Sequence, residues 1–328
     1  MMTRITGTGS ALPKEAVSNN KIAEWVETSD EWIRERTGIG NRRISNGETV
    51  VSLAAEACRK ALEQAGRKAE EIDMILLATC SPEYLLPCCA CQVQAEIGAV
   101  NAVAFDINAA CSGFLFGMTT ANAYIQSGMY KKILVIGSEV LSKIVDWADR
   151  STCILFGDGA GAALIEAQEE ETEYCGLIAS AQGSDGVKGM VLKCRERALK
   201  NPYIQEEFED GENLYVQMDG QAVYRFATRQ VPDCINVALE RAQLTVDDID
   251  LFVLHQANVR IIEAVARRLH ADPEKFPMNL DRVGNMSSAT IPVLLDELNR
   301  EGRLHKGDKI VLSGFGAGLT YGACIFVW

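Results

Sequence analysis

The chain alternates between amphipathic segments and short apolar runs that are bounded by polar turns. Two of these units are alike: ALEQAGRKAEEIDMILLA begins at Ala61, and ALERAQLTVDDIDLFVLH begins at Ala238. Apolar residues at helical spacing, an acidic turn and then a continuous apolar run predict an amphipathic helix followed by a buried strand. Helices that alternate with strands are typical of α/β proteins with buried sheets. The pattern therefore predicts an α/β fold.

The two units belong to a longer internal repeat. The offset along the chain that carries Ala61 onto Ala238 also carries residues 132–137 (KILVIG) onto residues 309–314 (KIVLSG), and Asn108 onto Asn285. A register that is kept over this length predicts two similar halves related by pseudo-symmetry. Each half would bury a face that a lone half leaves exposed to water.

A cysteine lies where a predicted strand meets a predicted helix. Residues 102–107 (AVAFDI) predict the strand, and residues 112–126 (SGFLFGMTTANAYIQ) predict the helix. Cys111 lies between them, where the amides of a helix N-terminus favour a thiolate and small neighbours leave room for an acyl group. A junction of this kind also suits a buried structural cysteine. Both interpretations of Cys111, nucleophile and packing residue, stay open on this feature alone.

Two more polar residues are candidates for the same site. His255 follows the apolar run 251–254, at a strand end where ligand chemistry collects in α/β proteins, although a hydrogen-bonded core histidine is the alternative. Asn285 lies three residues before the position that matches Cys111 in the repeat, so pseudo-symmetry brings it near the thiol; the alternative is a simple Gly-Asn turn. One amide of the glycine-rich turn 314–318, together with the amide of Cys111, is expected to form an oxyanion hole.

The acidic stretch 166–174 is the expected crossing between the halves. We expect an N-terminal half at residues 1–172, which carries the nucleophile, and a C-terminal half at residues 173–328, which carries the histidine and the asparagine. The polar stretch 193–212 interrupts the second half without a clear period. It is interpreted as either a lid or a surface excursion.

Composition and charge exclude several classes of function. The formal net charge of −13 argues against nucleic-acid binding, so any anionic ligand must meet a local cluster of Arg and Lys. No apolar run reaches the roughly 20 residues of a membrane span, and no apolar signal segment follows the first residues, so we expect no membrane association and a cytoplasmic location. Without a secretion signal, the eleven cysteines do not suggest disulfides. Cys88 and Cys91 lack a second ligand pair, so we expect no metal site.

Taken together, these motifs resemble the β-ketoacyl-acyl-carrier-protein synthase III family of thiolase-fold condensing enzymes. They run in order from SDEWIRERTGI, which begins at Ser29, through DINAACSGF, FGDGAGAA, HQANVR and GNMSSATIP to GFGAG. The resemblance covers nearly the whole chain. It implies a thiolase-like αβαβα layered fold, with two pseudo-symmetric halves and buried mixed sheets, and a homodimer.

The resemblance implies a two-step reaction without a cofactor. An acyl group passes from acyl-CoA to Cys111 as a thioester; malonyl-acyl-carrier-protein then loses CO₂, and its carbanion attacks the acyl-enzyme. The product would be 3-oxoacyl-acyl-carrier-protein, which initiates fatty acid synthesis. His255 and Asn285 are implied to donate hydrogen bonds to the thioester oxygen that becomes negative. The implied oxyanion donors are the amides of Cys111 and Ala317, where Ala replaces a commoner Gly.

The resemblance also implies the binding residues. Trp32 and Arg150 would sandwich the adenine of CoA, Arg36 would meet its phosphate, and Asn258 would hold the pantetheine arm. Leu86 would cross the dimer interface to close the partner's acyl pocket, at a position where the family often has Phe. A basic landing patch for the acidic acyl carrier protein is implied at Gln256, Ala257, Asn258, Val259, Arg260, Arg267 and Arg268.

Other functions are compatible with parts of this pattern. A papain-type hydrolase uses Cys, His and Asn in the same chain order, although its usual C-G-S-C-W context is missing here. A condensing enzyme of secondary metabolism, or an enzyme that moves acyl groups without extending them, fits the same motifs. The intact Cys/His/Asn set argues against a non-catalytic relative. The chain length and branching of the primer stay open.

Overall fold

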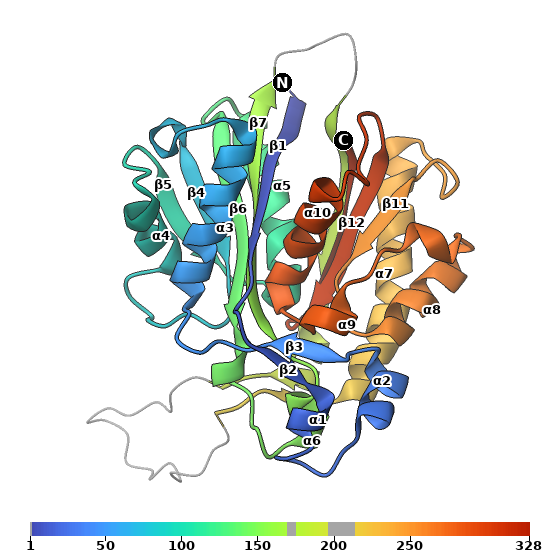
Figure 1. Ribbon diagram of the computed structural model, residues 1–328. Coiled ribbons are helices and arrows are strands. Elements are labelled where there is room, and N and C mark those ends of the chain that lie inside the picture. Colours follow the sequence, from blue (N-terminus) through green and yellow to red (C-terminus); the bar gives the residue numbers. More distant parts are fainter. Residues whose placement is uncertain (1, 169–174, 196–213) are drawn as a thin grey trace, which may run out of the picture.

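The computed structural model describes residues 2–168, 175–195 and 214–328. Helices α5 and α10 pack between two β-sheets, α3 and α4 cover the outer face of the first sheet, and α7 and α8 lie outside the second (Figure 1). The longer helices are α2 (Asp30–Thr37), α3 (Val50–Ala65), α4 (Cys89–Ile97), α5 (Gly113–Gln126), α7 (Gly220–Ala242), α8 (Val259–Leu269) and α10 (Thr290–Arg300). This αβαβα order confirms the predicted fold class.

The first sheet is mixed, with the strand order β1-β7-β6-β4-β5. Its strands are β1 (Met2–Ala11), β4 (Met74–Ala78), β5 (Val103–Ile107), β6 (Lys132–Val140) and β7 (Asp158–Gln168). β4 pairs in parallel with β5 and β6, so their carboxyl ends lie along one edge of the sheet. β7 runs antiparallel to both β6 and β1.

The second sheet has the order β11-β12-β13-β8. Its strands are β8 (Gly176–Ser184), β11 (Leu251–Leu254), β12 (Lys309–Gly316) and β13 (Thr320–Val327). β11 and β12 are parallel, whereas β13 runs antiparallel to β12 and β8. The first sheet therefore takes its strands from residues 2–168 and the second from residues 176–327. The boundary predicted after residue 172 lies outside the described residues and stays a prediction.

The internal repeat is visible in the backbone. The offset of the sequence repeat places the start of α5 on the start of α10, and the 3-10 turn η2 (Ala110–Ser112) on η6 (Ser287–Ala289). Ala110 and Ser287 occupy equivalent places and both have left-handed backbone angles, with φ of 46° and 48°. The backbone N–H of each donates a hydrogen bond to the side-chain Oδ1 of the asparagine two residues before it, Asn108 in the first half and Asn285 in the second. The two halves thus build the same tight turn.

Capping residues delimit the helices near the site. Ser29 caps α2, whose last turn ends at Gly38 with φ 81°, and Thr49 opens α3 with a capping box. Asn258 caps α8. The short elements are β2 (Ala16–Ser18), β3 (Asn41–Arg43), β9 (Leu192–Lys193), β10 (Gln217–Met218), α1 (Asn19–Ile22), α6 (Arg150–Cys153), α9 (Leu280–Val283), η1 (Ala69–Glu71), η3 (Leu141–Lys143), η4 (Gly186–Val191) and η5 (Pro273–Lys275). Of the predicted polar stretch 193–212, residues 196–212 lie outside the described residues.

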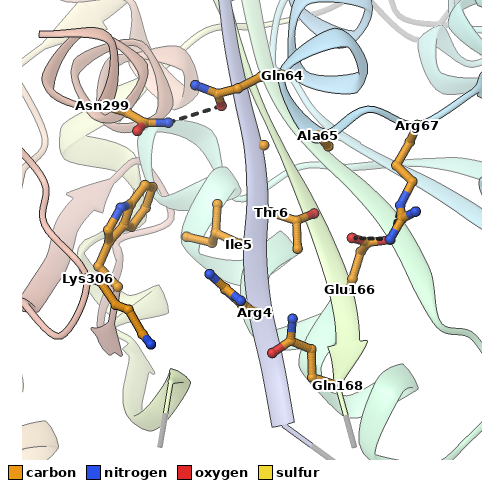
Figure 2. A pocket seen from close by; sticks show the side chains of 12 residues that line it. Arg4, Ile5, Thr6, Gln64, Ala65, Arg67, Glu166, Gln168, Asn299 and Lys306 are labelled. Carbon is orange, nitrogen blue, oxygen red and sulfur yellow. Dashed lines mark hydrogen bonds and ion pairs between the residues drawn. The ribbon is translucent and has the colours of Figure 1, made fainter. Parts of the chain in front are cut away.

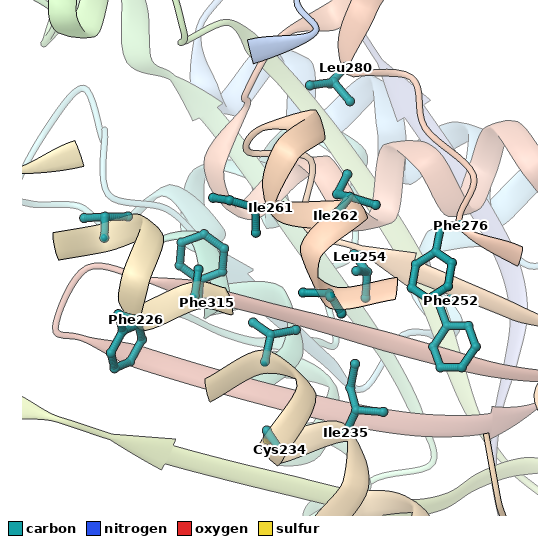
Figure 3. Packing of buried hydrophobic residues seen from close by; sticks show 14 of the residues in the cluster. Phe226, Cys234, Ile235, Phe252, Leu254, Ile261, Ile262, Phe276, Leu280 and Phe315 are labelled. Carbon is teal, nitrogen blue, oxygen red and sulfur yellow. The ribbon is translucent and has the colours of Figure 1, made fainter. Parts of the chain in front are cut away.

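A large apolar cluster joins α7 and α8 to the second sheet (Figure 3). Phe252 and Phe276 stack with their ring centroids 4.7 Å apart. Phe315, on β12, belongs to the same cluster and meets the ring of His255 edge to face at 5.5 Å. The core therefore extends to a candidate catalytic side chain and keeps water from one of its faces.

Within the described ranges, none of the helices has both the length and the apolar character of a membrane span. All eleven cysteines are free thiols. Cys91 is exposed on the first turn of α4.

Candidate active site

Cys111 lies in the turn η2, between the carboxyl end of β5 and the start of α5. Its side chain is 9% exposed. A Cβ added at Gly316, on β12, would lie 2.6 Å from the Cys111 nitrogen. Only a glycine at this position lets the second half approach the nucleophile turn so closely.

Burial raises the pKa of the Cys111 thiol to about 12, while a hydrogen bond with the Ser287 side chain acts in the opposite direction. The sequence argument for a resting thiolate is therefore wrong for this conformation. It considered the favourable helix N-terminus but not the cost of a buried charge, which is the larger effect. Cys111 rests as a thiol and must lose its proton during the reaction.

His255 follows β11, and its backbone N–H bonds the Ser313 carbonyl of β12 at 2.8 Å. The imidazole is buried, with 3% exposure, and its Nδ1 lies 2.6 Å from the Thr290 hydroxyl oxygen. Burial lowers the pKa of His255 to about 3, so the ring is neutral at physiological pH. A Cβ at Gly314 would lie 2.8 Å from the His255 Cβ, so this strand position also requires a glycine.

Asn285 is buried after the short helix α9. Its backbone is held to the segment between α6 and β7 by two hydrogen bonds, from its N–H to Leu155 O and from Gly157 N–H to its own carbonyl, both 2.9 Å long. Its side-chain Oδ1 accepts a hydrogen bond from the Ser287 N–H at 2.9 Å. This contact fixes the amide so that Nδ2 remains as a donor.

Cys111, His255 and Asn285 line one cavity of about 140 Å³, together with Asn258 and Phe315. The structure thus brings together three side chains that are far apart in the sequence. Asn285 therefore lies near the Cys111 thiol, as the pseudo-symmetry of the two halves predicts.

Cys111 also lines a second, larger cavity of about 480 Å³. Cys80, Leu141 and Ile144 contribute to its wall, and so does Ala317, the predicted second oxyanion donor. Ala317 is not among the non-glycine residues with positive φ in the described ranges, so alanine can replace glycine there without backbone strain. Cys111 therefore lies between two cavities.

The residues predicted for CoA lie together at the surface. The Arg36 and Arg150 guanidinium carbons are 4.4 Å and 4.8 Å from the centroid of the Trp32 ring. At this separation the Arg150 guanidinium itself occupies the position of a stacked base, so an adenine would have to displace it. Asn258 lines the cavity of Cys111, and its side chain also caps α8 and donates to Arg36 O at 3.0 Å.

The predicted carrier-protein patch needs one correction. Gln256 is fully buried, and its side chain bonds Leu254 O and the Asn279 N–H inside the protein. The prediction that it contacts a carrier protein is therefore wrong, because the turn after β11 points into the core. Ala257 and Val259 are half-buried. The arginines of the patch are exposed on α8, namely Arg260, Arg267 and Arg268.

Leu86 lies in the segment between β4 and α4 and is 85% exposed. It lines neither cavity of Cys111 in its own chain.

Sequence reasoning missed three polar residues that support the site. Thr290 and Ser287 contact His255 and Asn285, as described above. Glu139 is fully buried on β6 and accepts hydrogen bonds from Thr79, from Ser81 and from Ser288, the position that matches Cys111 in the repeat. The repeat register was the signal that marked this segment, since it aligns residues 287–290 with the nucleophile turn.

A separate groove crosses β1 near Arg4 and Thr6 (Figure 2). Its polar side chains bind one another, with Arg67 on Glu166 at 2.8 Å and Asn299 on Gln64 at 3.0 Å. Glu166 pairs with Lys132 at the amino end of β6, whereas Cys111 follows a carboxyl end. This groove therefore lies at the opposite end of the sheet from the candidate site.

Comparison with known proteins identifies the family. Residues 105–186 match 3-oxoacyl-[acyl-carrier-protein] synthase III, and residues 239–328 match the C-terminal region of the same family. The β-ketoacyl-[acyl-carrier-protein] synthase III of Clostridium novyi is 47% identical over 99% of this chain and 98% of its own. That of Synechococcus is 48% identical over 99% and 95%.

Solved structures agree with this result. The 3-oxoacyl-[acyl-carrier-protein] synthase III of Aquifex aeolicus is 39% identical, with a TM-score of 0.92 over 99% of this chain and 100% of its own. The priming β-ketosynthase of the R1128 polyketide pathway is 35% identical, with a TM-score of 0.91 over 99% and 96%. The predicted resemblance is confirmed: the chain belongs to the 3-oxoacyl-[acyl-carrier-protein] synthase III family of condensing enzymes.

Proposed function

We propose that the protein condenses an acyl-CoA primer with malonyl-acyl-carrier-protein through a thioester on Cys111, with no cofactor. The observation that carries this proposal is the single cavity lined by Cys111, His255 and Asn285. Family membership supplies the substrate classes, and the cavity supplies groups that fit the chemistry.

In the first step, the Cys111 sulfur attacks the thioester carbonyl of acyl-CoA. The new carbonyl–sulfur bond forms first, the carbonyl–sulfur bond to CoA then breaks, and the thiol proton ends on the CoA sulfur. The amides of Cys111 and Ala317 are proposed to bind the oxygen that becomes negative on the way. The space of about 480 Å³ beside Cys111 would receive the acyl chain.

In the second step, the malonyl group loses CO₂, and the electron pair of the broken bond stays on the α-carbon. Negative charge develops on the malonyl thioester oxygen, where His255 and Asn285 each offer an N–H donor. The carbanion then attacks the thioester carbonyl on Cys111. The cysteine sulfur leaves as a thiolate and takes a proton from water, which restores the thiol as 3-oxoacyl-acyl-carrier-protein is released.

A product assay tests the proposal. Acetyl-CoA is supplied with either malonyl-acyl-carrier-protein or malonyl-CoA, and mass spectrometry follows the carrier. We expect 3-oxobutanoyl-carrier only with malonyl-acyl-carrier-protein, and a primer panel from acetyl to branched and longer acyl-CoA ranks the preferred chain. If the protein extended acetyl-CoA only with malonyl-CoA, or with neither extender, the proposal would be contradicted.

A second candidate is priming in secondary metabolism. The similarity to the R1128 priming β-ketosynthase favours it, since that structure covers nearly the whole chain. The chemistry on Cys111 would be the same. A carrier protein from a polyketide cluster, compared with a fatty-acid carrier at equal concentration, separates the two by the ratio of kcat/KM.

We propose that Arg260, Arg267 and Arg268 form the landing patch for the acidic carrier protein. All three are exposed on α8, the helix whose N-cap, Asn258, lines the catalytic cavity. Local positive charge of this kind attracts an acidic partner despite the net charge of −13.

An Arg267→Glu variant is expected to raise the KM for malonyl-acyl-carrier-protein by roughly tenfold and to leave the KM for acyl-CoA unchanged. Arg267 suits this test because Arg268 is also bound to Asp233 at 3.1 Å. Arg303→Glu is the matched control, since Arg303, like Arg267, has one acidic neighbour at 3.8 Å. Equal KM values for the carrier in both variants would exclude the patch.

We further propose that the protein is a cytoplasmic homodimer in which a second copy covers Leu86. Leu86 and its neighbours Tyr84 and Leu85 form an exposed apolar tip. β5 lies at the edge of the first sheet with Val103 exposed, and unpaired edge strands favour pairing with another chain. The free thiols are compatible with the reducing environment of the cytoplasm. Cell fractionation tests the proposed cytoplasmic location.

Sedimentation velocity is expected to give a dimer for the wild type and a shift toward monomer for Leu86→Asp at low concentration. Association of two copies would bury the unpaired carboxylate of this aspartate in an apolar contact, and this burial costs free energy of association. Met129→Asp is the control, because Met129 is also exposed and apolar but precedes the amino end of β6. A monomeric wild type would overturn the proposal.

A further inference from the structure

The hydroxyl of Thr290 contacts one ring nitrogen of His255, Nδ1. The distance between Thr290 Oγ1 and His255 Nδ1 is 2.6 Å, and both residues are buried. Nδ1 is therefore engaged by a hydroxyl that can either donate or accept a proton. Which of the two happens decides whether the other nitrogen, Nε2, is a donor or an acceptor.

The Thr290 proton has two acceptors within reach. One is His255 Nδ1, and the other is the Ser287 carbonyl at 3.1 Å. The Ser287 carbonyl already accepts the backbone N–H of Thr290. That carbonyl therefore keeps a donor when the hydroxyl proton points to the ring, and the contact to Nδ1 is the shorter of the two.

The imidazole carries a single proton. It is buried beside Phe315, and its pKa is lowered to about 3 by that burial. When Nδ1 accepts from Thr290, the one ring proton must reside on Nε2. His255 then presents a donor, not a base.

We propose that Thr290 is a positioning residue that holds His255 as the Nε2–H tautomer, so that the ring donates a hydrogen bond to the malonyl thioester oxygen. This inference rests on the proposed role of His255. The same short segment also orients Asn285, because the Ser287 N–H occupies Oδ1 and leaves Nδ2 as the donor. Residues 287–290 thereby set both donors of the decarboxylation step.

The tautomer can be observed directly. The chain contains three histidines, so ¹⁵N-histidine labelling gives few signals, and His255→Ala assigns those of His255. We expect a protonated Nε2 and an unprotonated, hydrogen-bonded Nδ1 in the wild-type protein, unchanged between pH 8 and pH 5. Protonation at Nδ1 in that range would overturn the proposal, whatever the activity of the enzyme.

Two variants test the consequence. Thr290→Val keeps the shape but removes the hydroxyl, so the tautomer becomes mixed, and malonyl-acyl-carrier-protein decarboxylation is expected to fall by roughly ten- to hundredfold in kcat with KM unchanged. Thr290→Ser keeps the hydroxyl and is expected to retain both the wild-type ¹⁵N pattern and most of the rate. Acylation of Cys111 by acetyl-CoA should be equal in all three proteins, which also shows that the variants are folded.

The outcomes separate this inference from the proposed function. A Thr290→Val protein with the wild-type decarboxylation rate would refute the positioning role. Normal decarboxylation by His255→Ala would instead refute the proposed role of His255 itself.

Discussion

A Cys111→Ala variant is expected to gain no acyl mass from acetyl-CoA, whereas the wild-type protein gains one acetyl group that persists until malonyl-acyl-carrier-protein is added. Condensation should fall by roughly 10⁴-fold or more, because the nucleophile has no substitute. Intact-mass spectrometry of the protein after incubation measures the adduct, and the product assay measures the rate.

Cys80→Ala is the matched control for this experiment. Cys80 lines the same cavity as Cys111, and burial raises the pKa of its thiol well above the ordinary value. Its removal should leave the adduct intact. Rapid release of free acetate by the wild type, without a lasting adduct, would support the rival hydrolase and contradict the synthase.

His255→Ala and Asn285→Ala are each expected to slow decarboxylation of malonyl-acyl-carrier-protein by about 10²–10³-fold, the usual cost of one donor to a developing negative charge. Acylation of Cys111 should change far less, since its thiol proton leaves with CoA and neither donor faces the acyl-CoA oxygen in the proposed scheme. Single-turnover measurements of CO₂ release and of acyl-enzyme formation separate the two steps.

Asn285→Asp sharpens this test, because it keeps the size of the side chain but replaces the Nδ2 donor with an acceptor. We expect a loss at least as large as in Asn285→Ala. His270→Ala is the control histidine, since His270 is exposed at the end of α8. Slow acylation with normal decarboxylation in the His255 and Asn285 variants would reverse the assignment of roles.

The neutral state of His255 also sets the pH dependence. Because its pKa is lowered to about 3, the ring stays uncharged as the pH falls from 8 to 5, and it gains a proton only well below that range. Any loss of decarboxylation over this interval must therefore come from another group.

Much of the fold followed from periodicity and from the repeat. Alternating helices and buried strands indicated the layers, and the constant offset placed Asn285 near Cys111 before any coordinates. This worked because a duplicated unit repeats its backbone path as well as its sequence, down to the left-handed angles at Ala110 and Ser287.

Other features depend on contacts between distant segments and were not accessible to sequence reasoning. The raised pKa of the Cys111 thiol comes first from burial, which a hydrogen bond with the Ser287 side chain opposes, and only the packed structure sets both effects. Gln256 follows a strand in a polar stretch and was expected at the surface, yet its amide is used inside the protein. The contact between His255 and Thr290 joins two elements whose approach no local pattern encodes.

The two matching turns, η2 and η6, carry different side chains at the same position. In the first half the equivalent position holds the reactive sulfur, and in the second it holds Ser288, whose hydroxyl is tied to Ala78 O and to Glu139. In the proposed mechanism, one turn carries the covalent chemistry, while its counterpart holds His255 and Asn285, the two donors proposed for the malonyl thioester oxygen. Neither half produced alone would then catalyse condensation, and mixing separately made halves should restore turnover only when they assemble.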